Sequence, residues 1–440
     1  MYNFSLFLLL VGLILGTFQP IAAKEQDQER LIKMVVLSRH GLRSPIVPNS
    51  ELDEWTQKEW PYWPVNNGYL TSRGSILISN LWEALREDPW LNELLPQDIC
   101  SNPELIYVRA NTAERTQATA VAILNGLAPG CGLKYFVFDS KNKDPLFNST
   151  ETGDYPVDMS KVFQEFYQQY KEVQEIQKEL EKPLGLIVDI LGPCPKETCK
   201  KYGLPEGCTI LDIPSSVFFN KKKKKLKFIG GLHFASVATE CFLFMQGEWP
   251  RGNQTNLNIS YEQLEQLYPI YNTLSNIVNR LPEMATSRGS LLLNAIADAL
   301  TSSDVDSNIN KAKLVIFSGH EGNIQSIAGL LNLQWKIHGY PPNGTPPGGM
   351  LMFTLWETPN GNIVKIHYVC QELEAIVSPV GYPQKFFKQQ LKVIPYTSSS
   401  YTNTEQLECS EKQFRDWIDN VVDKNLLPKQ KVLLKSKRVL

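Results

Sequence analysis

LIKMVVLSRHGLRSP, residues 31 to 45, joins an expected strand directly to a cluster of cations. Leu31 to Leu37 is a nearly continuous apolar run with β-branched residues, typical of a strand buried on both faces of a parallel sheet. Arg39, His40 and Arg43 follow at once. The 440-residue chain has only five histidines, so one placed between two arginines calls for a chemical reason.

A second apolar run ends in the same way. Residues 105 to 108 (LIYV) lead into a segment whose apolar positions recur at helical spacing. Asn111 and Glu114, three residues apart, form an N-cap pair that starts this helix. The pair places Arg115 in the first helical turn.

The third such run is residues 314 to 317 (LVIF), which leads through Ser318 and Gly319 to His320, with a helix expected from about 323 to 331. In an open α/β sheet the carboxyl ends of parallel strands share one edge, and ligands bind there. We therefore expect the residues that follow the three strands to form one site.

The middle of the chain has a different pattern. Between Tyr155 and Met284 we find no alternating strand pattern, whereas apolar helical faces recur at residues 160–181, 234–246 and 261–280. Residues 350–357 and 363–369, joined by PNGN, predict a hairpin. The predicted fold class is α/β, a mostly parallel sheet flanked by helices with an inserted smaller α-helical cap domain.

We divide the chain into five parts on these patterns. The last part is rich in lysine and matches no targeting motif, so we expect a disordered end. The parts are a signal peptide at 1–23, an α/β segment at 24–150, a helical cap insertion at 151–284, a second α/β segment at 285–425 and a basic tail at 426–440.

The first part has the features of an export signal. An apolar stretch from Phe4 to Phe18 precedes Pro20 and the small residues Ala22 and Ala23. The first residues carry no lysine or arginine, so an uncleaved anchor stays open as the alternative. Our interpretation is a secretory protein, extracellular or lysosomal, or periplasmic in a bacterium, without a stable membrane anchor after signal cleavage.

Charge and cysteines narrow the class further. The net charge of −2 gives no overall field to attract nucleic acid or an anionic membrane. Eight cysteines, an even number, fit disulfides in an oxidising compartment, and the absence of any C-x-x-C pair argues against zinc. Four glycosylation sequons lie beyond the signal region, at Asn148, Asn253, Asn258 and Asn343.

The arginines and the histidine fit phosphoryl chemistry. Arg39, Arg43 and Arg115 offer donor forks suited to a phosphate, and neighbouring cations disfavour imidazolium, which leaves His40 a neutral nucleophile. Glu321 is the candidate proton donor to the leaving group, and His320 would donate to a phosphoryl oxygen. The alternative is a set of surface arginines beside a core histidine.

R-H-G-x-R-x-P, which Arg39, His40, Gly41, Arg43 and Pro45 match in full, resembles the signature of the histidine acid phosphatases. The resemblance extends through VRANTAERTQATAVAILNGLAPGC, GLHFASVATECFLFMQGE and PPGGMLMFTLWE. It implies a phosphoglycerate mutase-like α/β domain with a helical cap, no metal cofactor and activity at acidic pH. It makes His40 the phosphohistidine nucleophile and the three arginines its phosphate ligands.

The same resemblance implies two disulfides, Cys100–Cys131 and Cys199–Cys208, and leaves Cys194, Cys241, Cys370 and Cys409 without assigned partners.

One position departs from the family. The family usually carries His-Asp as its second catalytic pair, and this chain has His320-Glu321. One extra methylene displaces a proton donor by about an ångström, which can slow a reaction about a hundredfold.

The predicted function is a secreted, metal-independent acid phosphomonoesterase that acts on small-molecule phosphate monoesters through a phosphohistidine. Within the family the alternatives are phytase or glucose-1-phosphatase specificity. The run Lys221 to Lys225 would attract a polyanion, or else form a solvated loop. From a different class, a phosphate-ester binding protein impaired in catalysis by Glu321 stays open, and so does a homodimer.

Three further histidines are assigned on their surroundings. We expect His338, His367 and His233 to be structural, with the alternative for His233 that it lines a pocket mouth. A metal-dependent phosphatase is disfavoured, because HEGNI lacks the second histidine of the H-E-x-x-H metal motif.

Overall fold

The apolar run at residues 31–37 lies in the middle of the sheet, as its sequence predicts. The computed structural model describes residues 29–139, 143–303, 306–378, 386–393, 406–422 and 436–439, so the predicted signal peptide at 1–23 lies outside the described residues. The strand order is β10-β8-β7-β1-β6-β2-β3-β11, with β9 paired to β8. The strands are β1 (Arg30–Arg39), β2 (Ile106–Ala110), β3 (Tyr135–Phe138), β6 (Leu314–Gly319), β7 (Met350–Glu357), β8 (Ile363–Gln371), β9 (Phe386–Gln390), β10 (Cys409–Ser410) and β11 (Ser436–Val439).

The four strands β1, β6, β2 and β3 are mutually parallel and form the centre of the sheet. The predicted α/β class with a mostly parallel sheet is confirmed there. The predicted hairpin is confirmed as the antiparallel pair β7 and β8, which extends the sheet beyond β1.

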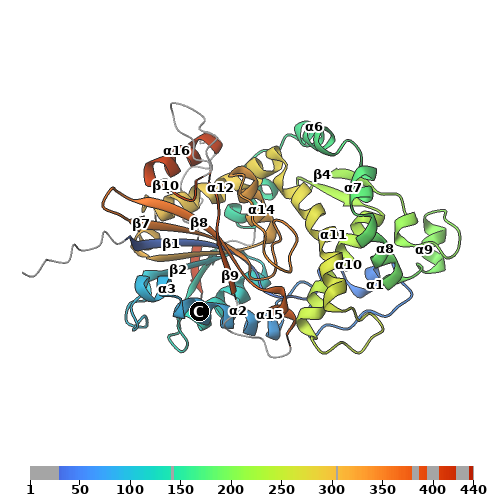
Figure 1. Ribbon diagram of the computed structural model, residues 1–440, viewed down its shortest axis with the longest axis horizontal. Helices are drawn as coiled ribbons and strands as arrows, with labels where there is room; N and C mark the ends of the chain where they lie inside the picture. The colour runs from blue at the N-terminus through green and yellow to red at the C-terminus, as the bar shows by residue number, and fades with distance from the viewer. Residues whose placement is uncertain are drawn as a thin grey trace, which may run out of the picture.

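Helices cover both faces of this sheet, as Figure 1 shows with α12 and α16 on one side and α2 and α3 on the other. Met34 and Val36 of β1 belong to one apolar cluster, and Val35 and Leu37 belong to the other. Burial on both faces explains why the run is continuously apolar rather than alternating. The flanking helices are α2 (Ser72–Glu87), α3 (Pro89–Leu94), α4 (Glu114–Leu127), α5 (Pro145–Thr152), α12 (Pro282–Leu300), α13 (Ser307–Lys311), α14 (Glu321–Leu330), α15 (Leu373–Val377) and α16 (Glu411–Val421).

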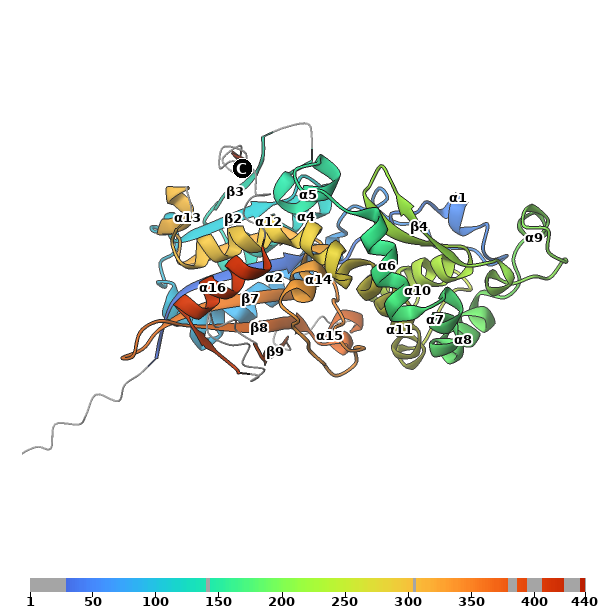
Figure 2. The same cartoon turned by 90° about the horizontal axis from the view of Figure 1, so that it is seen from above.

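A second group of helices lies beside the carboxyl edge of the sheet, and we call it the cap (Figures 1 and 2). The expected helix at 160–181 is divided, because Lys171 takes a positive φ of 55° and ends the first piece. The short helix α1 (Asn49–Leu52) also lies with the cap, and Trp55 stacks on Phe234 with ring centroids 4.6 Å apart. The cap helices are α6 (Met159–Tyr170), α7 (Val173–Glu179), α8 (Glu181–Leu191), α9 (Lys196–Lys201), α10 (Gly231–Glu248) and α11 (Tyr261–Arg280).

The prediction of no strands between Tyr155 and Met284 is wrong. Strands β4 (Ser216–Asn220) and β5 (Lys225–Ile229) form an antiparallel hairpin in the cap. An alternating pattern is present in β5, where Leu226 and Phe228 are buried, but it continues the lysine run that masks it. The turn lacks an Asn-Gly signal, since Lys224 supplies its positive φ of 43°.

The expectation of a disordered basic tail is also wrong for its last residues. Ser436–Val439 forms β11, which pairs antiparallel with β3 at the edge of the sheet. The backbone of an edge strand has unpaired N–H and C=O groups, and these can pair with a chain of any composition. A basic composition therefore did not prevent strand formation.

The cysteines follow the resemblance. The disulfides Cys100–Cys131 and Cys199–Cys208 are both formed. The four cysteines left unassigned, Cys194, Cys241, Cys370 and Cys409, are free and buried. Among the helices that the structure describes, none combines the length and apolar character needed to cross a membrane.

Candidate active site

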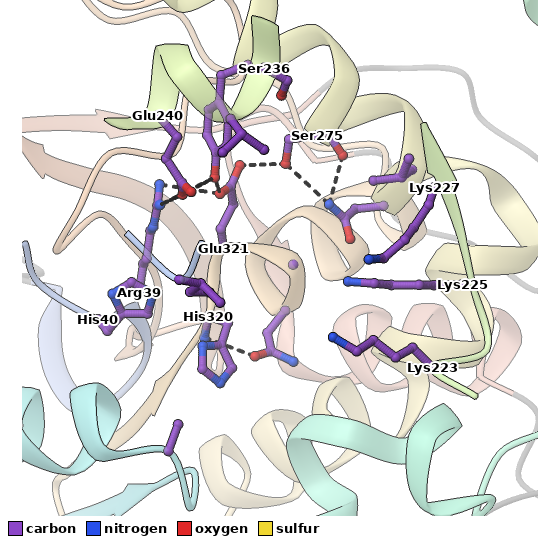
Figure 3. A pocket seen from close by; sticks show the side chains of 18 of the residues that line it. Arg39, His40, Lys223, Lys225, Lys227, Ser236, Glu240, Ser275, His320 and Glu321 are labelled. Atoms are coloured by element: carbon purple, nitrogen blue, oxygen red, sulfur yellow. Dashed lines mark hydrogen bonds and ion pairs between the residues drawn. The ribbon is translucent and has the colours of Figure 1, made fainter. Parts of the chain in front are cut away.

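The carboxyl ends of β1, β6 and β2 bring the predicted residues together. His40 follows β1, and its backbone N–H donates to the carbonyl of Gly319 at 3.0 Å. The rings of His40 and His320 lie edge to face with centroids 5.6 Å apart. Both line a cavity of about 650 Å³ between the sheet and the cap, together with Arg39 and Glu321 (Figure 3). Arg43 and Arg115 line the same cavity. The expectation that the strand ends share one site is confirmed.

His40 is buried, with 4% of its surface exposed. Its Nδ1 lies 2.9 Å from the carbonyl oxygen of Gly41, and since a carbonyl only accepts, Nδ1 carries the hydrogen. Burial lowers the pKa of His40 well below 6.5, and Arg115, Arg43 and Arg39 lower it further. The ring is therefore neutral in mildly acidic water, with the Nε2 lone pair available to attack.

Gly41 has a packing role in the motif. A Cβ at this position would lie 2.7 Å from Cγ1 of Ile78 and 3.0 Å from Cδ1 of Leu70. The backbone N–H of Gly41 also donates to Oγ1 of Thr119 at 3.0 Å. The loop that carries His40 thus lies directly against α2 and α4, which fixes the position of the imidazole.

The three arginines leave donors unused. Within the described residues, the buried Nε atoms of Arg39, Arg43 and Arg115 have no hydrogen-bond partner. Buried donors without partners are costly, so a cluster of three indicates a site for an anion. Arg39 and Arg43 are almost fully buried, at 1% and 3% exposed, which rules out the alternative of surface arginines.

Glu240 of α10 is a site residue that the sequence analysis missed. Its carboxylate accepts from Nη2 of Arg43 at 3.0 and 3.1 Å and from Nη2 of Arg39 at 3.2 Å. Burial alone would raise the pKa of Glu240, but Arg43 and Arg39 outweigh it and hold the pKa below its usual value. An acidic residue in the interior of the mostly apolar helix GLHFASVATECFLFMQGE was the available signal.

His320 has a polar side chain next to each ring nitrogen. Nδ2 of Asn111 lies 3.0 Å from its Nε2, and Nη2 of Arg115 lies 3.4 Å from its Nδ1. Burial lowers the pKa of His320 well below 6.5, and Arg115 and Arg43 add to the effect. The ring is therefore neutral in the structure.

The expected N-cap role of Asn111 is wrong. The helix α4 begins at Glu114 with Ala113 as its cap residue, and Asn111 donates instead to Asn148 and His320, at 3.0 Å each. The short polar side chain that suits a cap also suits a ligand of a neighbouring histidine. Arg115 is nevertheless in the first turn, as predicted.

Glu321 is the first residue of α14, and its carboxyl group faces the cap. Oε1 accepts from the hydroxyl of Ser275 at 2.5 Å, and Oε2 is hydrogen-bonded to the hydroxyl of Tyr271. Nη1 of Arg39 lies 3.4 Å from Oε2. Tyr271 and Ser275, both from α11, are further site residues without a sequence signal.

The opposite wall of the cavity is basic. Lys223, Lys225 and Lys227 of the β4–β5 hairpin extend toward His320 and Glu321 in Figure 3. Desolvation lowers the pKa of Lys225 to about 7, and Arg288, Lys227 and Lys223 contribute. Lys221, Lys222 and Lys223 are exposed, as the solvated-loop interpretation of the lysine run expects, but Lys223 and Lys225 also line the cavity.

The other three histidines lie in different surroundings. His233 lines the cavity, so the pocket alternative holds for it rather than the structural assignment, and burial lowers its pKa to about 4. His367 is buried in β8 against Trp90, whereas His338 is exposed. In the described parts of the chain, no three His, Cys, Asp or Glu side chains converge as a metal site would require.

Comparisons with known proteins agree with this geometry. A sequence model described as histidine phosphatase superfamily (branch 2) matches residues 30–369. The chain is 30% identical over 375 residues to phytase AppA of Escherichia coli (strain K12), covering 81% of this chain and 84% of the relative. It is 27% identical over 369 residues to glucose-1-phosphatase of Salmonella typhimurium (strain LT2), covering 82% and 86%. The solved apo phytase of Hafnia alvei aligns with a TM-score of 0.80 at 28% identity, over 91% of this chain and 99% of that one.

Proposed function

Because the chain belongs to branch 2 of the histidine phosphatase superfamily, we propose that it hydrolyses phosphate monoesters, with His40 as nucleophile and Glu321 as proton donor. One observation carries the proposal: three buried arginine Nε donors without partners surround a neutral histidine. Three guanidinium groups around one point suit a dianionic phosphoryl group, and such an arrangement would be costly in a purely structural cluster.

The reaction follows from this arrangement in two steps. The lone pair on Nε2 of His40 attacks phosphorus while the bond to the leaving-group oxygen breaks, and the arginines stabilise the charge on the phosphoryl oxygens. Glu321 gives a proton to the leaving oxygen. Water then attacks the phosphohistidine, returns a proton to Glu321 and releases phosphate and His40.

The test is phosphate release from p-nitrophenyl phosphate between about pH 4 and 7 with EDTA present, comparing the wild type with His40→Ala. We expect turnover in the wild type and none in the variant, with binding of inorganic phosphate to the variant retained in calorimetry. His338→Ala, at an exposed position, is the matched control. Phosphate binding without wild-type turnover would favour the impaired binding protein instead.

A second, finer candidate is phytase-type specificity for a substrate with several phosphates. The wall of Lys223, Lys225 and Lys227 supports it, because these cations line the same cavity as the three arginines. Relatives of this chain are named phytase and glucose-1-phosphatase. A glucose monophosphate has no second phosphate for this wall to bind.

The test of specificity is the triple variant Lys223→Gln, Lys225→Gln, Lys227→Gln against inositol hexakisphosphate and p-nitrophenyl phosphate. We expect KM for the hexakisphosphate to rise about tenfold or more, since three lost ion pairs at partly exposed positions are worth about 0.5 kcal/mol each, and KM for the aryl phosphate to stay within about twofold. Lys221→Gln, Lys222→Gln on the exposed turn is the control. Equal changes for both substrates would refute the specificity.

A further inference from the structure

Three cap residues on one face of α11 form a hydrogen-bonded chain that ends at Glu321. Tyr271, Ser275 and Asn279 are spaced four residues apart, so their side chains lie above one another on the helix. Nδ2 of Asn279 lies 3.3 Å from Oγ of Ser275, which donates to Oε1 of Glu321. Tyr271 contacts Oε2 of the same carboxyl group. Both oxygens of Glu321 are therefore held by the cap.

The hydroxyl of Tyr271 lies between two carboxyl groups. It is 2.9 Å from Oε1 of Glu240 and hydrogen-bonded to Oε2 of Glu321. A tyrosine hydroxyl has one hydrogen, and an ionised carboxylate has none to give. Two hydrogen bonds in a row of three oxygens therefore need a second hydrogen, which one of the carboxyl groups must carry.

Glu240 is not the group that carries it. Its two oxygens accept three hydrogen bonds from the guanidinium groups of Arg39 and Arg43, an environment that favours the ionised form. Glu321 has a weaker pairing, a single ion pair with Nη1 of Arg39 at 3.4 Å, and that nitrogen also donates to the carbonyl of Thr345. The second hydrogen thus belongs on Oε2 of Glu321.

We propose that Tyr271 and Ser275 are positioning residues that hold Glu321 protonated and aimed at the leaving group, so that glutamate serves where the related enzymes usually use aspartate. Ser275 fixes Oε1 as the accepting oxygen, and Tyr271 donates to Glu240 while accepting from Oε2 of Glu321. This inference rests on the proposed phosphatase function.

The proton balance of the step is complete. As the P–O bond breaks, the leaving oxygen keeps the electron pair of that bond. It takes the hydrogen on Oε2 of Glu321, which before the step is donated to the hydroxyl oxygen of Tyr271. Glu321 becomes a carboxylate, which Ser275 and the hydroxyl of Tyr271 stabilise. The water that cleaves the phosphohistidine then restores the proton to Glu321.

The experiment compares kcat/KM for two substrates that differ in how much the leaving group needs a proton. Glycerol 2-phosphate leaves as a strongly basic alkoxide, whereas 2,4-dinitrophenyl phosphate leaves as a stable phenolate. The variants are Tyr271→Phe, Ser275→Ala and Glu321→Gln. Tyr268→Phe is the matched control, because its buried hydroxyl, one turn away on α11, has no hydrogen-bond partner among the described residues.

We expect Glu321→Gln to lower kcat/KM for glycerol phosphate about 10²- to 10⁴-fold, the usual worth of a general acid, and the dinitrophenyl phosphate value by less than about threefold. Tyr271→Phe and Ser275→Ala should reproduce this selectivity with losses of about tenfold or more on the alkyl substrate. Tyr268→Phe should change neither value.

Two outcomes would overturn the inference. Equal losses on both substrates would mean that Tyr271 and Ser275 only support the structure, and no loss on either would mean that Glu321 does not need them. Failure of the proposed function gives a different result, since the wild type would then turn over neither substrate, or would do so independently of His40.

Discussion

The imidazole rings of His40 and His320 lie edge to face, 5.6 Å between centroids, at the ends of two neighbouring parallel strands. Burial and the surrounding arginines lower the pKa of both rings well below 6.5. Two neutral imidazoles can lie this close, whereas two imidazolium ions would repel each other in a site that already holds three arginines. Both imidazole rings therefore stay neutral in mildly acidic water.

The arginines should set the acid limit of activity. Because His40, as the proposed nucleophile, must be neutral and its pKa lies below 6.5, kcat/KM for p-nitrophenyl phosphate should not fall as the pH drops through 6.5. Arg115→Met removes a cation that lowers this pKa, so the acid limb of the pH profile should move to higher pH. Arg251→Gln, at an exposed position, should leave the limb in place. If the acid limb of the profile does not move in Arg115→Met, a group other than His40 determines it.

Lys225 should make binding of a multiply charged substrate depend on pH. Its pKa of about 7 means that it is charged at pH 5 and mostly neutral at pH 8. KM for inositol hexakisphosphate should therefore rise more steeply between pH 6 and 8 in the wild type than in Lys225→Arg, whose charge persists. Because the substrate ionises in the same way in both assays, comparing the two proteins removes the contribution of substrate ionisation to the change in KM. Parallel pH profiles would exclude Lys225 from the binding wall.

The buried pair of Arg109 and Asp144 should be important for stability. Nε and Nη2 of Arg109 donate to both carboxylate oxygens of Asp144 at 3.0 to 3.1 Å. Arg109→Met leaves a buried carboxylate without its counterion, which should cost about 3–5 kcal/mol in the free energy of unfolding. Adding Asp144→Asn should recover part of this loss in urea unfolding at pH 7. A double variant less stable than Arg109→Met alone would contradict this account.

His367 should make the protein less stable in acid. Its pKa is lowered to about 3 by burial first, then by Lys388 and Lys365, whereas it is about 6.5 in the unfolded chain. As the pH falls below 6.5, the unfolded state takes up a proton that the folded state does not. Stability should thus decrease by about 2 kcal/mol between pH 6.5 and 5.

His367→Phe should remove that part of the pH dependence while keeping an aromatic ring against Trp90. Urea unfolding at pH 7 and pH 5 measures it, and His338→Gln at an exposed position is the control. If His367→Phe and the wild type lose equal stability on acidification, the His367 explanation fails.

The sequon at Asn148 should not carry a glycan. Asn148 lines the cavity, where its Oδ1 accepts from Asn111 at 3.0 Å, and the following Ser149 and Thr150 are buried. Peptide mass spectrometry of active protein secreted from a eukaryotic host should find Asn148 unmodified. Asn258, which is exposed, is the comparison site. A glycan on Asn148 in active protein would mean that this part of the cavity is not needed.

Much of the sheet and half of the site could be predicted from the sequence. Strands buried on both faces leave continuous apolar runs, and a basic residue or histidine directly after such a run lies at the carboxyl edge. His40, Arg39 and His320 were found in this way. The hairpin β4–β5 was missed because its two buried residues, Leu226 and Phe228, alternate with lysines that belong to a longer basic run.

The cap's contribution to the site could not be predicted. Tyr271 and Ser275 are ordinary polar positions of an amphipathic helix, and only the packing of α11 on α14 brings them to Glu321. Glu240 was visible as an acidic residue in an apolar helix, but its partners Arg39 and Arg43 are about two hundred residues away in the chain. Asn111 was misassigned because caps and site ligands favour the same side chains.

The contacts of α10 and α11 also bear on how this fold can diverge. In an enzyme whose cap only selects substrates, one cap can be exchanged for another while the reacting groups stay intact. Here the same two helices neutralise the arginines through Glu240 and hold the carboxyl group of Glu321. In the proposed mechanism, substrate range and turnover are therefore not modular in this chain.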